Sequence, residues 1–493
     1  MAGLLIAVGL CEGLFGKAYG GTQRDLFTCA VQDPDGSLVI AGYTGTADVL
    51  VVKVNPSGTP LWAKTFAGPG LDYAHAITRT SDGGYAIAGH TTGIGNKDFL
   101  VLKLGPDGSL EWAKAYGTSN EEEYPCSIIQ TPEGGYAVTG SAYLSTHYDA
   151  ILFKLHPDGS LEWAKDFGDA DHGDGPCDMI MTPDGGFVLV TYATSYPNSE
   201  FRLLKLSSDG SLQWGNAYWG GFSYPNPSSI FQTADQGFIL TGNLYGYTCW
   251  IMKLSSAGSI QWTRRVGGSN LETGSDVVQA PDGGYVVTGA TRSFGAGDYD
   301  VFAFKLSSNG GSLEWFKTFG GAGEDHPYFL LPTLDGNYLI GGYVYSYGAG
   351  SSDGFLLKIP PNGSYPDCVI DAGPTVEALY PSLNTVSVPN TIYNLTSTDL
   401  AITVGDPSLT VMDICPPTDL EEGAETRHPI TCLPVPSGLL LISREEMLPL
   451  RIYAADGRLA YSGELRRGEN RITLGHGVYL WQAGQYKGKA IVR

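Results

Sequence analysis

Asp82-Gly83-Gly84-Tyr85-Ala86-Ile87-Ala88-Gly89 is the stretch that decides the fold, because close variants of it recur along the chain. In each copy an acidic residue and a glycine form a turn, and the alternating apolar run that follows is typical of a β-strand. Neighbouring copies are 47 to 53 residues apart. The seven copies begin at Asp35, Asp82, Glu133, Asp184, Asp235, Asp282 and Asp335. A unit of this length cannot bury its own apolar faces, so the units must stack on one another.

Two further features recur along the repeats, the first in all seven units and the second in six of them. An apolar run ends in lysine, and a glycine turn then leads into a strand that carries tryptophan. The lysines are Lys53, Lys103, Lys154, Lys205, Lys253, Lys305 and Lys358, and the tryptophans are Trp62, Trp112, Trp163, Trp214, Trp262 and Trp315. The run before each lysine is apolar on both faces, which suits a strand packed between neighbouring sheets. The sequence therefore predicts an all-β chain built around a seven-bladed β-propeller.

The two ends of the repeat region complete each other. After Lys358 the tryptophan strand is missing, whereas Leu14–Gly20 matches Glu111–Gly117, with Phe15 in the tryptophan position. We therefore expect the segment 14–19 to pair with the strand 354–359 and to close the ring, which removes the exposed edges of an open array. The predicted propeller spans residues 14–360.

The order of these motifs resembles that of kelch-type propellers and of the related repeats in secreted bacterial propellers. The resemblance covers residues 14–360 and implies four strands in each blade. In the unit quoted first they are Ala74–Thr80, Gly84–Gly89, Asp98–Leu104 and Ser109–Tyr116. It implies little about function, because propellers serve as enzymes, lectins and scaffolds.

The composition excludes some partners. The net charge is -22, and nucleic acids and anionic membranes both require basic surfaces. No apolar run reaches the 18 residues that a membrane span requires, so no membrane-spanning segment is expected. Residues 1–13 contain the short apolar stretch Leu4–Val8, which we interpret as the remnant of a signal peptide.

The last part of the chain, residues 433–493, contains Pro434-Val435-Pro436, a strand leading into Asp456-Gly457-Arg458, the strand Gly477–Leu480 and a basic ending. It resembles the C-terminal sorting domain of the bacterial type IX secretion system, although the family usually has Pro-Asn-Pro at the entry. The resemblance implies a small β-sandwich, export across an outer membrane and an extracellular or outer-membrane location. The alternative is an accessory β-domain with no sorting role.

Residues 361–432 have a different composition, rich in proline, serine and threonine. Between Ile359 and Thr426 there is no lysine or arginine. Prolines permit edge pairing but not a central strand, so this segment is either a stiff linker or an extended β-rich arm that adds strands to a ring or to another chain. An interaction arm would bury its apolar side chains, which are Val386, Ile392, Leu395, Ile402 and Val404. Cys368 is expected to pair with Cys415, or Cys415 with Cys432, or neither.

Acidic residues supply one set of candidate sites. Ten residues before most of the acid-glycine turns stands another acid, and these acids are Asp25, Asp72, Glu123, Asp174, Glu272 and Asp325. They are expected to accept backbone N–H groups of the adjoining loops. Alternatively, these carboxylates collect cations, or they act as the catalytic acids of a polysaccharide lyase or hydrolase. A loop with Asp169, Asp171 and Asp174 alternates oxygen ligands of the kind that Ca²⁺ takes, or is a solvated acidic loop.

Aromatic residues supply a second set, where the repeat rules fail together. Between residues 214 and 250 the chain carries Tyr218, Trp219, Phe222, Tyr224, Tyr245 and Tyr247. Exposed aromatics stack on sugars or dock proteins, but they could equally fill a gap between blades. Together these features favour a secreted, surface-displayed, non-enzymatic binding or structural module. Its ligand is a carbohydrate or a protein at the face that carries the long loops, and its arm could mediate self-assembly into an extracellular polymer.

Overall fold

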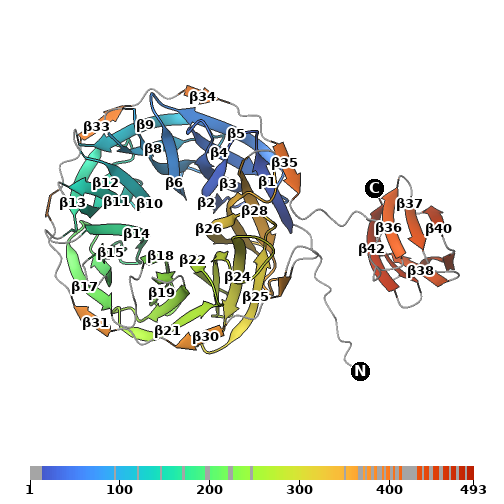
Figure 1. Cartoon of the computed structure of the whole chain (residues 1–493). Helices are drawn as coiled ribbons and strands as arrows, with labels where there is room; N and C mark the ends of the chain where they lie inside the picture. Colours follow the sequence, from blue (N-terminus) through green and yellow to red (C-terminus); the bar gives the residue numbers. More distant parts are fainter. Residues whose placement is uncertain are drawn as a thin grey trace. The chain divides into compact units, whose positions relative to one another are not determined.

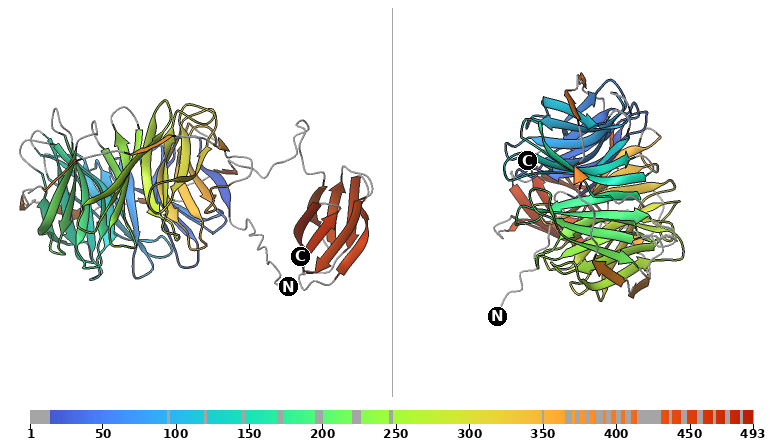
Figure 2. Two further views of the ribbon diagram at one scale, coloured as in Figure 1. Left: turned by 90° about the horizontal axis from the view of Figure 1, so that it is seen from below. Right: turned by 90° about the vertical axis from the view of Figure 1, so that its left-hand side faces the viewer.

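The computed structural model describes residues 14–364, with gaps at 94–95, 119–120, 145–146, 169–172, 195–199, 220–225, 245–247 and 349–350. Beyond residue 364 it describes only the backbone of short strands. Throughout these described parts every regular element is a β-strand. Seven five-stranded sheets stand like blades around a central axis (Figure 1), and Figure 2 shows them from the side. The chain is thus a seven-bladed β-propeller, as the repeats predict.

Each blade has four main strands, and the first of them lies nearest the axis (Figure 1). Blade 1 contains β2 (Leu26–Gln32), β3 (Leu38–Tyr43), β4 (Val49–Val54) and β5 (Pro60–Ala67). Blade 2 contains β6 (Asp72–Arg79), β7 (Tyr85–Thr91), β8 (Asp98–Leu104) and β9 (Leu110–Gly117). Blade 3 contains β10 (Glu123–Gln130), β11 (Tyr136–Leu144), β12 (His147–Leu155) and β13 (Leu161–Asp166). Blade 4 contains β14 (Gly173–Met181), β15 (Phe187–Thr194), β16 (Glu200–Leu206) and β17 (Leu212–Trp219). Blade 5 contains β18 (Asn226–Gln232), β19 (Phe238–Leu244), β20 (Thr248–Leu254) and β21 (Ile260–Gly267). Blade 6 contains β22 (Glu272–Gln279), β23 (Tyr285–Thr291), β24 (Asp300–Leu306) and β25 (Leu313–Phe319). Blade 7 contains β26 (Asp325–Pro332), β27 (Tyr338–Val344), β28 (Asp353–Ile359) and β1 (Phe15–Gly20).

The ring closes with its N-terminal strand. β1 pairs with β28 in an antiparallel register that joins Phe15 to Lys358 and Tyr19 to Gly354. The predicted closure is therefore confirmed. The side chains of Phe15, Ala18 and Tyr19 are all buried at this junction.

The segment after the ring adds a fifth strand to every blade, and we call these seven short strands the belt. The belt strands are β29 (Ile370–Asp371), β30 (Thr375–Ala378), β31 (Ser382–Thr385), β32 (Thr391–Ile392), β33 (Thr396–Asp399), β34 (Thr403–Gly405) and β35 (Thr410–Asp413). They pair in turn with β25, β21, β17, β13, β9, β5 and β1, so the belt runs backwards around the rim from blade 6 to blade 7 (Figure 1).

The belt pairs with edges of the chain's own ring, whereas the sequence left open whether the partner of such an arm is a ring or another chain. Proline-spaced, short strands are well suited to the outermost position, where only one edge of each strand is paired. One prediction from the sequence is that the arm buries its apolar side chains, which are Val386, Ile392, Leu395, Ile402 and Val404. Another is a disulfide between Cys368 and Cys415 or between Cys415 and Cys432. All of these side chains lie outside the described part of the chain. Both stay predictions.

The repeated residues hold each blade together. In the turn before β7 the Asp82 carboxylate accepts the N–H of Gly84 at 2.9 Å, and Gly83 takes a φ of 86° that favours glycine. The same carboxylate pairs at 2.9 Å with Lys103, whose side chain is almost fully buried. Equivalent pairs join Lys205 to Asp184 at 2.9 Å and Lys253 to Asp235 at 3.0 Å. The lysine therefore neutralises the turn acid of its own blade in these three blades, whereas in blade 1 Lys53 pairs at 2.7 Å with Asp33, two residues before the turn acid.

The repeated tryptophan joins one blade to the next. A Cβ atom at Gly159 would lie 2.9 Å from the Trp112 ring, and Gly159 has a φ of 76°. Only glycine satisfies both conditions at this turn. The Tyr116 hydroxyl then donates to the carbonyl of the same glycine at 2.6 Å. The aromatic end of each fourth strand is thus a structural contact between blades.

The acids at the start of the first strands are also structural. Asp25, Asp72 and Asp325 are buried and accept the N–H groups of Gly21 at 2.8 Å, Gly68 at 2.5 Å and Gly321 at 3.0 Å. Glu123 and Glu272 accept N–H groups in the same way. The expectation that these carboxylates hold the adjoining loops is confirmed for these five acids.

The chain forms two compact units, residues 1–417 and 418–493. In the second unit, β36 (Ile430–Val435), β37 (Gly438–Ser443) and β40 (Gly468–Thr473) form one sheet. β38 (Leu448–Ala454), β39 (Leu459–Leu465), β41 (Gly477–Ala483) and β42 (Tyr486–Val492) form the other.

Candidate functional site

Every first strand carries a β-bulge at the same place, and the bulges shape the wall that faces the axis. The bulged residues are Thr28, His75, Cys126, Cys177, Ser228, Ser275 and Tyr328. A bulge re-aims a side chain out of the regular alternation and is common next to functional sites. Because these positions are structurally equivalent but chemically different, they give the blades different side chains along this wall.

A second variable set lies two residues before each bulge, paired with the end of the second strand. From blade 1 to blade 7 the pairs are Leu26 with Tyr43, Tyr73 with His90, Tyr124 with Ser141, Gly175 with Tyr192, Asn226 with Asn243, Thr273 with Ala290 and His326 with Tyr343. Side chains are mostly small or polar in blades 4 to 6 and mostly aromatic in blades 7, 1, 2 and 3. The axial wall is therefore asymmetric.

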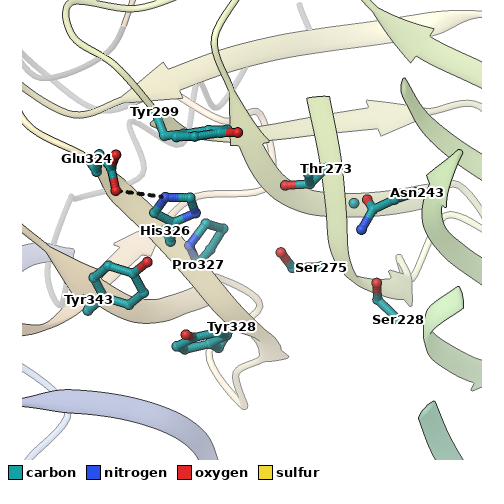
Figure 3. Close-up of a pocket in the computed structure, with 11 residues that line it drawn as sticks. Ser228, Asn243, Thr273, Ser275, Tyr299, Glu324, His326, Pro327, Tyr328 and Tyr343 are labelled. Carbon is teal, nitrogen blue, oxygen red and sulfur yellow. Dashed lines mark ion pairs between the residues drawn. The ribbon is translucent and has the colours of Figure 1, made fainter. Parts of the chain in front are cut away.

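A cavity of about 590 Å³ lies where the two kinds of wall meet. One side is lined by Ser228, Asn243, Thr273, Gly274 and Ser275, and the other by Tyr299, Glu324, His326, Pro327, Tyr328 and Tyr343. Figure 3 shows the aromatic group on one side of the cavity and the small hydroxyl and amide groups on the other.

The aromatic side is a packed stack. The His326 ring lies 4.6 Å from Tyr299 and 5.1 Å from Tyr343, measured between ring centroids, and Tyr343 lies 5.6 Å from Tyr328. The Arg292 guanidinium sits 4.3 Å from the centroid of the Tyr299 ring and braces the stack from outside the cavity lining. Packed neighbours fix the rings, so the wall presents a preformed surface.

The histidine on this wall is neutral at physiological pH. Burial lowers the pKa of His326 to about 4, and the nearby Arg292 also lowers it, against an opposing effect of Asp298. Its Nε2 lies 4.0 Å from Glu324 Oε2. His326 therefore offers one N–H donor and one nitrogen acceptor rather than a positive charge. Burial likewise raises the pKa of Tyr343 to about 12, so that hydroxyl remains a hydrogen-bond donor.

The opposite side of the cavity carries polar side chains. Asn243 lines it with an amide group, although its Oδ1 atom is itself buried and has no hydrogen-bond partner in the described part of the ring. Ser228, Thr273 and Ser275 stand beside it with hydroxyl groups that can both donate and accept.

The aromatic residues that the sequence selected lie elsewhere. Tyr218 is fully buried, stacks on Phe201 at 4.7 Å and donates its hydroxyl to the carbonyl of Gly258 at 2.6 Å. It holds two blades together, as Tyr116 does, so its place in a ligand site is corrected to a place in the core. Trp219 ends β17, with its side chain outside the described residues, and Phe222, Tyr224, Tyr245 and Tyr247 also lie outside them.

The calcium prediction falls on the same kind of segment. Asp169 and Asp171 lie outside the described residues, and only the backbone of Asp174, in β14, is described. Among the residues whose side chains are described, no three His, Cys, Asp or Glu side chains are grouped to hold a metal ion. A calcium site in this loop stays a prediction. Of the seven bulged residues, Cys177 is the one whose side chain the structure does not describe.

The sequence did contain a signal for the cavity. When the seven units are aligned on their acid-glycine turns, the position seven residues before the turn holds the bulged residue of every blade. Blade 7 alone has a tyrosine there, Tyr328, and its second strand carries Tyr343 near its end and is followed by Tyr345. Comparing the residues at which the aligned units differ indicates blade 7 as the place of a site.

Comparison with known proteins finds only distant structural matches. No protein-family model and no curated protein matches the sequence. Among solved structures, Sqt1 of Chaetomium thermophilum aligns with 70% of this chain and 97% of its own, at 10% identity and a TM-score of 0.41. PorZ, a surface component of the type IX secretion system of Porphyromonas gingivalis, aligns with 97% of this chain and 100% of its own, at 10% identity and a TM-score of 0.29. At these values neither neighbour indicates what this chain binds.

Across the described residues there is no helix with the length and apolar character needed to cross a membrane.

Proposed function

We propose that this protein is a carbohydrate-binding module whose ligand occupies the cavity between blades 5, 6 and 7. The observation that carries the proposal is the pairing of an aromatic wall with a wall of small hydroxyl and amide groups. A sugar ring has an apolar face that stacks on aromatic side chains and an edge of hydroxyls that needs hydrogen bonds. The two walls supply these two kinds of contact.

Binding fits the cavity better than hydrolysis does. Glycoside hydrolysis generally uses two carboxyl groups that flank the bond to be broken. The residues that line this cavity include a single carboxylate, Glu324. The carboxylates Asp25, Asp72 and Asp325 are buried and already accept backbone N–H groups, so they do not reach a ligand. Among the residues that line this cavity, a polysaccharide hydrolase would therefore lack its second carboxyl group.

A glycan array probed with the intact protein tests this function. We expect binding to a subset of polysaccharides and a loss of about tenfold or more in affinity for Tyr328→Ala, because the exposed ring forms the mouth of the cavity and stacking contributes about 0.5–1.5 kcal/mol beyond the buried area. Leu61→Ala is a matched control, because Leu61 is exposed on the fourth strand of blade 1. Binding that Tyr328→Ala leaves intact, or binding to proteins alone, would contradict the proposal.

We also infer that the module acts outside the cell. The support is the kelch-like order of the repeats and the resemblance of residues 433–493 to a type IX sorting domain, with the two small sheets formed by strands between 430 and 492. We expect protein recovered from the cell surface or medium to lack residues from about 433 onward. Mass spectrometry of the intact chain measures this, and an unprocessed chain in the cytoplasm would contradict it.

A further inference from the structure

The aromatic wall extends far beyond the cavity. Within blades 6 and 7 the contacts run from Tyr299 to His326, then to Tyr343, which touches both Tyr328 and Tyr345. Successive ring centroids are 4.6 to 5.9 Å apart. This run lies on the side of the cavity that continues toward blade 1.

A second run of rings begins in blade 1. Tyr43 contacts Tyr73 at 4.7 Å, Tyr73 stacks on His90 at 4.7 Å, and His90 contacts Tyr124 at 5.3 Å. Tyr148 and Tyr143 of blade 3 continue it, at 6.1 Å and 5.0 Å. The second run therefore spans blades 1, 2 and 3.

The two runs lie in neighbouring blades, 7 and 1. Tyr43 and Tyr343 stand at equivalent positions near the ends of the second strands of these blades, each paired with the residue two before the bulge. The effects of Tyr345 on Tyr43 and of Tyr43 on Tyr328, which raise the pKa of the hydroxyl acted on, agree with this placement. We call the eleven residues Tyr299, His326, Tyr343, Tyr328, Tyr345, Tyr43, Tyr73, His90, Tyr124, Tyr148 and Tyr143 the aromatic arc.

Exposure singles out the arc from the other aromatic residues. Among the described side chains, three large aromatic ones are counted as exposed: Tyr143 at 40%, Tyr328 at 44% and Tyr345 at 45%. All three belong to the arc, and they lie near its middle and at its far end. Aromatic rings left in water forgo the free energy of burial, so these three exposed rings mark points at which the arc is open to a ligand.

We propose that the aromatic arc is an extended binding track for a linear glycan chain, which enters the cavity beside Tyr328 and runs over blades 7, 1, 2 and 3. This inference rests on the proposed carbohydrate-binding function and adds that the ligand is a long chain rather than a single sugar. Sugar rings stack on the exposed side chains Tyr328, Tyr345 and Tyr143, and the charged groups along the track, Lys97 over Tyr124 and Glu122 beside it, supply contacts to their hydroxyls. Affinity therefore grows with chain length.

Binding of size-graded oligosaccharides tests the track. The probes are cello-, xylo-, manno-, laminari- and chito-oligosaccharides, each as a disaccharide and as an octasaccharide, measured by calorimetry with the full chain. For the series that binds, we expect the octasaccharide to bind about tenfold or more tightly than the disaccharide. Tyr143→Ala should abolish most of that difference while leaving the disaccharide affinity unchanged, because Tyr143 lies at the end of the arc far from the cavity.

The possible results separate the two proposals. Equal affinity for short and long oligosaccharides, or an octasaccharide affinity that Tyr143→Ala does not change, overturns the track and leaves the cavity as a site for short sugars. No binding in any of the five series contradicts both. Tyr143 is exposed, so its removal should not disturb folding, and an unchanged melting temperature of Tyr143→Ala verifies this.

Discussion

A chain that begins at Gly21 is expected to melt more than about 10 °C below a chain that begins at Leu14. The missing strand, β1, pairs on one side with β28 and on the other with the belt strand β35. Its removal therefore opens the ring between blades 7 and 1 and also frees the last strand of the belt. The comparison with a start at Leu14 isolates β1 from residues 1–13.

Two buried aromatic side chains account for most of the expected loss. The Phe15 ring lies within 2.6 Å of the position that a Cβ atom would take at Gly58 in blade 1, and the Tyr19 hydroxyl donates to the Gly58 carbonyl at 2.6 Å. Removing a buried aromatic side chain costs about 3–5 kcal/mol each. Tyr19→Phe, which removes only the hydrogen bond, should cost about 1 kcal/mol. Differential scanning calorimetry measures all three chains, and a truncated chain that melts with the longer one would show that blade 7 is stable with its edge open.

The repeat predicts the blades because each of its residues makes a local contact that the fold requires. The predicted strands of blade 2 differ from β6, β7, β8 and β9 by at most two residues at either end. The turn acid, the buried lysine and the tryptophan each satisfy a contact that every blade must make. Where every copy has the same task, the sequence repeats, and a period is readable without a structure.

The candidate site was harder to predict because its residues are related through space rather than through the repeat. Tyr218 was selected because aromatic residues are dense around it, yet it occupies the same place as Tyr19 and Tyr116, where the hydroxyl reaches a glycine of the next blade. That equivalence was visible in the sequence and marked a structural role. The bulge that turns Tyr328 toward the axis depends on backbone pairing with β27, which no local pattern reveals.

The belt was predictable as extended edge strands, but its partner was not. Its strands are two to four residues long, too short for a period-two pattern to show which face is buried. Their pairing with β25, β21, β17, β13, β9, β5 and β1 depends on the spacing between belt strands matching the spacing between blades. That match is a property of the assembled ring.

A chain that ends at Ser364 is expected to associate, whereas a chain that ends at Pro417 is expected to remain a single particle. The shorter chain lacks the belt and leaves the outer edges of seven fourth-position strands unpaired, and such edges are templates for pairing with another molecule. Each lost backbone hydrogen bond contributes about 0.5–1.5 kcal/mol, so the melting temperature should fall as well. The chain that ends at Pro417 keeps the belt and loses only the second compact unit.

Sedimentation velocity over a range of concentrations distinguishes the two possible roles of the belt. If the belt protects its own ring, loss of residues 365–417 produces concentration-dependent oligomers from a monomer. If belt strands instead pair between molecules, the chain that ends at Pro417 is itself oligomeric and the chain that ends at Ser364 is not. The intramolecular pairing of β35 with the N-terminal strand β1 favours the first result, because the belt ends on the strand that closes the ring and both closures then depend on the same six residues, Phe15–Gly20.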